Sequence, residues 1–127
     1  MIVGVGIDLV DIGRVERMIV RYGDRALRRL FTAAEVAYAT ARAEPYQHLA
    51  ARVAGKEAAF KALSGTESAR TVTWHELEVA TNHDGRPHLV FHGAAQRRAD
   101  ELGVSRSWIT LTHSDGMAAA FVILEGH

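Results

Sequence analysis

The chain has 127 residues, of which 48% are hydrophobic, and its 15 basic and 15 acidic residues cancel. This length and composition predict a single domain, residues 1–127, and the neutral balance argues against a general nucleic-acid coat protein, whose affinity rests on excess Lys and Arg. Because there is no cysteine, disulfides, thiol nucleophiles and thiolate zinc sites are excluded, which fits a reducing cytoplasm.

Local signals mark the first strand and the first helix. Residues 2–9 are apolar and β-branched with two glycines, which predicts a buried strand. Asp8 interrupts this stretch and no basic leader precedes it, so we interpret it as neither a signal peptide nor a membrane span and expect a soluble, cytoplasmic protein. Asp11 can cap a helix over residues 12–22, and Gly23 offers its end.

Two further helices are expected in the first half of the chain. Thr32 and Glu35 have the spacing of a capping box ahead of an alanine-rich helix. Pro45 separates that helix from the clearest one in the sequence, residues 46–63.

The second half changes to strand-like segments, which are residues 76–81, 87–92, 108–112 and 117–124. Turn clusters at residues 82–85 and 113–116 join them in pairs. A short helix over residues 93–102, ended by Gly103, lies between the two pairs. The predicted fold class is therefore α+β, with a mostly antiparallel sheet and the long helix packed against it.

The long helix carries a group of charged residues. Glu57 and Lys61 lie four residues apart and share a face, so they can form an ordinary surface salt bridge, which is common and weak. Arg52 and Lys56 add two more cations among small neighbours that let a ligand come close. Three cations around one carboxylate suit a polyphosphate, so the sequence leaves both interpretations open.

Asp8 is an acid at the end of an otherwise apolar strand. A buried carboxylate must be paired, hydrogen-bonded or metal-bound, because desolvating it alone is too costly. It can cap nearby backbone groups, or it can act together with Glu57. Two carboxylates from distant parts of the chain, completed by phosphate oxygens and water, are how Mg²⁺ is usually held.

Arginines recur every three or four residues at Arg14, Arg17, Arg21, Arg25 and Arg28. If the helix persists past Gly23, these side chains form one basic stripe, which is either a solvated helix face or a docking surface for an acidic protein partner. RNA binding is a third possibility, weakened by the lack of interleaved aromatic residues.

Taken in order, five segments resemble the holo-[acyl-carrier-protein] synthase family of 4′-phosphopantetheinyl transferases: residues 2–16, 31–35, 48–63, 84–87 and 109–124. Each motif alone is only suggestive, whereas the ordered set is highly specific and covers nearly the whole chain. The chain departs from the family where Gly55 precedes the Lys56-Glu57 pair. A glycine inside a helix costs about 1 kcal/mol relative to alanine.

The resemblance implies a function and a set of site residues. The enzyme would transfer 4′-phosphopantetheine from coenzyme A to a serine of apo acyl carrier protein, or of a carrier domain of a fatty acid synthase, and release 3′,5′-ADP. Asp8 and Glu57 match the acids that hold Mg²⁺, and Lys61 matches the lysine beside the coenzyme A pyrophosphate, which makes these three the catalytic residues. Arg14 and Arg21 match the helix that meets the carrier protein.

The remaining implied residues would bind coenzyme A, together with Lys61: His48, Arg52, Gly85, Arg86, Pro87 and His113. The family is a homotrimer whose active sites lie at subunit interfaces, so some of these residues would serve a neighbour's substrate. No nucleic-acid or membrane partner is implied. The alternatives are a metal-dependent phosphodiesterase and a non-catalytic module that binds coenzyme A or a nucleotide.

Overall fold

The computed structural model describes residues 1–127 and consists of helices α1–α5, two short 3₁₀ helices and strands β1–β5. In chain order the elements are β1 (Ile2–Asp11), α1 (Ile12–Tyr22), α2 (Asp24–Leu30), α3 (Ala33–Thr40), α4 (Pro45–Leu63), η1 (Glu67–Thr71), η2 (Trp74–Glu76), β2 (Leu77–Thr81), β3 (Pro87–Phe91), α5 (Gly93–Leu102), β4 (Val104–Ser114) and β5 (Met117–Gly126). The α+β class predicted from the sequence is confirmed.

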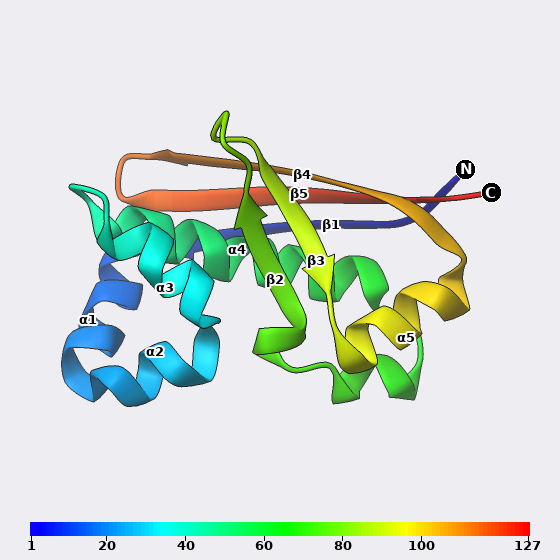
Figure 1. Cartoon of the computed structure of the whole chain (residues 1–127), viewed down its shortest axis with the longest axis horizontal. Helices are drawn as coiled ribbons and strands as arrows, with labels where there is room; N and C mark the ends of the chain where they lie inside the picture. The colour runs from blue at the N-terminus through cyan, green and yellow to red at the C-terminus, as the bar shows by residue number, and fades with distance from the viewer.

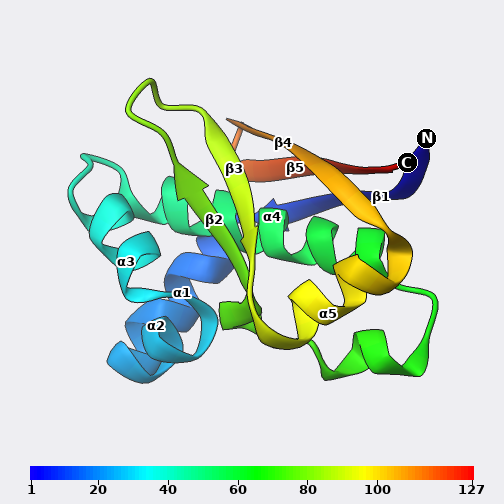
Figure 2. The ribbon, with the colours of Figure 1, turned by 45° about the vertical axis from the view of Figure 1, so that its right-hand side comes forward.

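The strands form two antiparallel sheets. The larger has the order β1-β5-β4, and the smaller is the hairpin β2-β3. Helix α4 runs along the three-stranded sheet, and the hairpin crosses over the other side of this helix (Figure 1). Helices α1–α3 gather at one end of the molecule and α5 at the other, as the turned view shows (Figure 2). Helix α4 is therefore covered on most sides and forms the centre of the fold.

Helix boundaries follow the local signals. The Asp11 side chain accepts a hydrogen bond from the amide of Arg14 and caps α1, while Thr32 and Glu35 form the expected capping box at α3. Gly103, in the left-handed conformation with φ 72°, ends α5. None of the helices is long and apolar enough to cross a lipid bilayer.

The condition for a continuous basic stripe is not met, because the helix ends at Gly23 as its sequence predicted. Gly23 adopts φ 59° and ψ −137°, which interrupts the helix between α1 and α2. The arginines of the two helices therefore do not follow one axis. The last predicted turn, residues 113–116, is shorter in the structure than the sequence indicated. His113 and Ser114 belong to β4, and only Asp115 and Gly116, both with positive φ, make the turn.

Strand β1 is not the buried strand that its apolar sequence suggested. It lies at the edge of the larger sheet, where Val5, Ile7 and Leu9 are 50%, 64% and 64% exposed. The reason is the two-residue period of a strand: the alternate residues face α4, and these three point away from it. An apolar sequence run shows which residues can be buried, whereas only the fold decides which face is covered.

The face of β1 that meets α4 carries the two glycines of the first motif. A β-carbon at Gly6 would overlap the carbonyl oxygen of Ala58, and one at Gly4 would overlap that of Ala62. Glycine at these positions therefore lets the strand backbone approach the helix backbone closely. This approach sets Asp8, two residues beyond Gly6, beside the helical turn that follows Lys56.

Candidate functional site

Asp8, Glu57 and Lys61 come together where β1 crosses α4. The Lys61 ammonium donates hydrogen bonds to Asp8 Oδ1 at 2.9 Å and to the Ile7 carbonyl at 3.0 Å. The ion pair of Lys61 is thus made with Asp8 on the strand and not with Glu57 on its own helix. Because the Lys61 side chain is 52% exposed, its charge remains accessible to a ligand.

Glu57 lies close to a like charge. Partial burial raises the pKa of Glu57, the neighbouring Asp8 carboxylate raises it further, and Lys61 opposes both effects. Two hard carboxylates from separate elements that face one cavity, with room for water and phosphate oxygens, are a donor set that suits a magnesium ion. The residues present therefore fit a divalent cation between Asp8 and Glu57.

One cavity of about 880 Å³ joins the two carboxylates to the predicted docking arginines. Asp8, Glu57, Arg14 and Arg21 all line it, together with Trp74. These residues come from β1, α4, α1 and η2, so four separate parts of the chain build the site. The cavity places the acidic pair beside a basic rim on α1.

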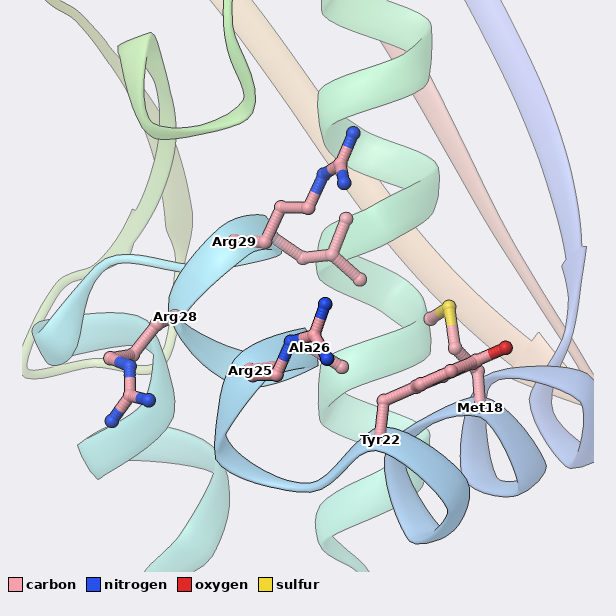
Figure 3. A pocket seen from close by; sticks show the side chains of 7 residues that line it. Met18, Tyr22, Arg25, Ala26, Arg28 and Arg29 are labelled. Atoms are coloured by element: carbon pink, nitrogen blue, oxygen red, sulfur yellow. The ribbon is translucent and has the colours of Figure 1, made fainter.

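A second hollow adjoins this cavity at the turn from α1 to α2. Arg25, Arg28 and Arg29 surround it, while Met18 and Tyr22 supply apolar surface (Figure 3). Met18 and Tyr22 also line the cavity of Asp8 and Glu57. The basic surface thus extends beyond α1, although Gly23 turns the chain.

The predicted nucleotide residues gather in a different, smaller cavity of about 230 Å³. Its lining includes His48, Arg52, Gly85, Pro87 and His113. No residue lines both this cavity and that of Asp8 and Glu57. Within one chain, the predicted site residues therefore form two separate groups.

Two predicted nucleotide residues lie apart from the smaller cavity. Arg86 does not line the smaller cavity. It lies in the exposed hairpin loop, where its backbone amide donates a hydrogen bond to the Asp84 side chain. Lys61 belongs with Asp8, as described above.

Arg52 is the most buried cation of the smaller cavity, with 2% of its surface exposed. Its guanidinium donates to Thr81 Oγ1 at 2.6 Å and to the His48 carbonyl at 3.4 Å, and its Nε has no partner. Burial lowers the pKa of Arg52, although a guanidinium stays protonated in proteins. An unpaired buried cation of this kind favours an anionic ligand.

The lowered pKa of His48 is consistent with positive charge around this cavity. Burial lowers the pKa of His48 first, followed by the charges of Arg52, Arg42 and His113. No Asp or Glu lines the cavity. The lining is therefore cationic or neutral, which suits an anionic ligand.

The polyphosphate interpretation of Lys56 is wrong. Its side chain is fully buried, pairs with Glu35 at 2.8 Å and donates to the carbonyls of Trp74 and Leu77. The partner carboxylate lies 21 positions earlier in the sequence, at the capping box of α3, where no local pattern links it to α4. Lys56 therefore belongs to the interior, Lys61 is the accessible cation of the three, and Arg52 is buried in the lining of the smaller cavity.

Sequence reasoning also missed Thr81, which holds Arg52, and Tyr38, which lines the smaller cavity. Neither residue carries a motif that would have identified it.

Comparison with known proteins gives a consistent result. A family model described as the 4′-phosphopantetheinyl transferase superfamily matches residues 4–122. The chain belongs to this superfamily. It is 46% identical over 125 residues to a holo-[acyl-carrier-protein] synthase of Koribacter versatilis, an alignment that covers 98% of this chain and 99% of the relative.

Solved structures agree with this assignment. The fold matches holo-[acyl-carrier-protein] synthase from Neisseria meningitidis with a TM-score of 0.85 and 26% identity, over 98% of this chain and 99% of that one. It also matches the synthase from Bacillus anthracis in complex with CoA (3′,5′-ADP), with a TM-score of 0.79, 29% identity and coverage of 100% and 99%. The chain thus shares both sequence and architecture with the family over its full length.

Proposed function

We propose that this protein is a holo-[acyl-carrier-protein] synthase, which transfers 4′-phosphopantetheine from coenzyme A to a serine of an apo acyl carrier protein or carrier domain and releases 3′,5′-ADP. Membership of the superfamily and 46% identity to a synthase over nearly the whole chain support this assignment. The observation that carries it is the cavity in which the carboxylates of Asp8 and Glu57 lie beside Arg14 and Arg21.

Asp8 and Glu57 would hold Mg²⁺ together with oxygens of the coenzyme A pyrophosphate. When bound, the ion would neutralise phosphate charge and polarise the phosphorus under attack. Lys61, half exposed and held by Asp8, is suited to stabilise negative charge on the transferred group and on the leaving oxygen.

The reaction exchanges one phosphorus–oxygen bond for another. The serine hydroxyl of the carrier forms a new bond to the phosphorus attached to pantetheine, and the bond from that phosphorus to 3′,5′-ADP breaks. The serine proton passes to Glu57 or to a water molecule that Glu57 orients. Positioning of the two substrates should supply much of the rate enhancement.

The smaller cavity would take the nucleotide end of coenzyme A. Its unpaired Arg52 and the adjacent His48 and His113 suit a phosphate, and Gly85 and Pro87 give it a neutral wall from the hairpin loop. Arg86, exposed in the same loop, would reach the substrate from outside. Because this cavity shares no residue with that of Asp8 and Glu57, a single chain does not present both halves in one pocket.

A homotrimer with active sites at subunit interfaces would join the two halves. The face of the larger sheet that points away from α4 is apolar and partly exposed, and the register aligns its members in rows: Val5, Ile123 and Trp108, then Ile7 and Phe121. Exposed apolar surface of this kind is characteristic of an interface. We infer that copies of the chain pack through this face.

Subunit complementation tests the shared site. Asp8→Asn and Arg52→Gln chains, each inactive alone, are mixed in equal amounts under conditions that exchange subunits. Activity should recover to about a quarter of wild type, because each ring interface needs an intact half from each of two neighbours. Activity no greater than that of the separate variants, in trimers shown to be mixed by mass, would contradict a site shared between subunits.

The basic rim on α1 would dock the acidic carrier protein. Charge reversal at Arg14 or Arg21 is expected to raise the KM for the carrier about tenfold at low salt, with little change in the KM for coenzyme A. Arg97→Glu, on α5 and away from this cavity, is the matched control. Steady-state kinetics with each substrate varied in turn measure the effect, and equal losses for both substrates would contradict docking at this rim.

Intact mass spectrometry tests the reaction itself. Apo carrier protein incubated with the enzyme, coenzyme A and Mg²⁺ should gain the mass of one phosphopantetheine, and EDTA should prevent the gain. Coenzyme A binding without transfer would indicate a non-catalytic module, and coenzyme A cleavage without a carrier would indicate a phosphodiesterase. The absence of cysteine fits the reducing cytoplasm, in which we infer that the enzyme works.

A further inference from the structure

A further pocket of about 250 Å³ adjoins the cavity of Asp8 and Glu57. We call it the side pocket. Glu57 and Trp74 line both spaces, so the side pocket begins beside a carboxylate that we assign to the metal. Helix α4 supplies Phe60 to its wall, and the segment after η1 supplies Val72. A group that passes Glu57 from the larger cavity therefore meets a largely apolar surface.

The side pocket contains one accessible cation. Lys56 is part of the lining, but its ammonium is fully buried and paired with Glu35. Arg70 is exposed, and none of the four ion pairs of the chain involves it. The only carboxylate in the lining is Glu57, which is assigned to the metal. The Arg70 guanidinium is therefore available to an anionic group of a ligand.

The part of the donor that suits the side pocket is the pantetheine arm with whatever its thiol carries. This step rests on the proposed function. The arm is joined to the phosphorus that is assigned to Asp8 and Glu57, whereas the nucleotide end is assigned to the smaller cavity, which shares no residue with the side pocket. The arm itself consists of neutral amide, hydroxyl and thiol groups. Free coenzyme A therefore offers no partner for the charge of Arg70 along this arm.

We propose that Arg70 is a specificity-determining residue, which favours acyl-coenzyme A donors whose acyl group ends in a carboxylate. An arginine and a carboxylate form charge-assisted hydrogen bonds, and the apolar walls of Phe60, Val72 and Trp74 limit competition from water. The reaction is the one already described. The same phosphorus–oxygen bond breaks, the thioester stays intact, and the carrier receives acyl-phosphopantetheine in place of phosphopantetheine.

The test compares malonyl-coenzyme A with acetoacetyl-coenzyme A, in which a methyl group replaces one carboxylate oxygen and removes the charge. Wild type should show a kcat/KM for the malonyl donor about five- to tenfold above that for the acetoacetyl donor at low salt. In Arg70→Gln this ratio should fall to within about twofold of one, and Arg70→Lys, which keeps the charge without the fork, should be intermediate. The intact mass of the carrier identifies the acyl group transferred.

Arg97→Gln is the matched control, because Arg97 is an exposed arginine outside the side pocket, and it should keep the wild-type ratio. A wild-type ratio near one would overturn the proposal, and so would a ratio unchanged in Arg70→Gln. Equal losses for both donors would also overturn it, because they would give Arg70 a general role in binding or folding. Thermal unfolding checks that the variants are folded, and Arg70→Lys carries the test if the glutamine variant is not.

Calorimetric binding of the two donors separates this proposal from the function itself. Wild type should bind malonyl-coenzyme A several-fold more tightly than acetoacetyl-coenzyme A, and Arg70→Gln should lose most of that difference, whether or not transfer to a carrier is observed. Transfer from coenzyme A without any difference between the two donors would count against the role of Arg70 alone. The expected difference in binding without transfer would count against the proposed reaction alone.

Discussion

Replacing Lys56 with methionine is expected to lower the free energy of unfolding by about 3–5 kcal/mol, the usual effect of removing one partner of a buried ion pair. The Lys56 and Glu35 side chains are 0% and 1% exposed, so the substitution would leave the Glu35 carboxylate buried without its charged partner. The carbonyls of Trp74 and Leu77 would also lose their donor. A loss of this size is a large part of the stability of an ordinary small domain.

Urea unfolding of matched variants measures this effect. Lys61→Met, five residues further along α4, removes a half-exposed pair with Asp8 and should cost less than about 1 kcal/mol. The double variant Lys56→Met/Glu35→Gln should be more stable than Lys56→Met, since no uncompensated charge remains. If Lys56→Met lay within about 1 kcal/mol of wild type, the buried pair would not anchor α4 as described.

The buried pair of Lys56 and Glu35 is a feature that the sequence did not predict. Asp11, Thr32, Pro45 and Gly103 mark element boundaries through contacts with residues a few positions away, so the sequence predicted those boundaries closely. Lys56 has the same appearance in sequence as Lys61, but Lys56 meets residues 18 to 21 positions away in the chain. Its burial depends on packing between elements, which helical periodicity does not reveal.

The same distinction applies to the candidate site. The ordered set of sequence motifs identified Asp8 and Glu57 as candidate metal ligands, and the structure brings both into one cavity. Their roles stay predictions. The nucleotide residues and the metal pair fall into separate cavities, and neither cavity is visible in the sequence. Tyr38 was missed because an aromatic residue within an alanine-rich helix is usually interpreted as core. Its cation–π contact with Arg52, its edge contact with His48 and its place in the lining connect it to the pocket.

Asp8→Asn is expected to reduce kcat about 10²- to 10³-fold, because several kcal/mol of charge stabilisation depend on an intact Mg²⁺ site. The amide is nearly the size of the carboxylate, and the strand backbone that packs through Gly6 is unaffected, so the fold should persist. Transfer assays over a range of Mg²⁺ concentrations, with circular dichroism as a check of folding, measure the loss. Activity near the wild-type level would show that Asp8 does not hold the metal.

Glu57→Gln should also reduce transfer strongly, yet it should stabilise the metal-free protein at neutral pH. The pKa of Glu57 is raised by burial and by Asp8, so as pH rises the unfolded state loses its proton before the folded state does. Stability therefore falls as pH rises from the ordinary glutamate pKa to the raised one, and the deficit persists at neutral pH.

Tm measurements without metal should therefore show Glu57→Gln above wild type at pH 7, with the difference vanishing near the acid limit. Millimolar Mg²⁺ should raise the Tm of wild type and not that of the variant, because ligand binding stabilises only the state that holds it. A variant less stable than wild type at pH 7 without metal would mean that Glu57 is a structural partner, and the assignment of this carboxylate to the cation would fail.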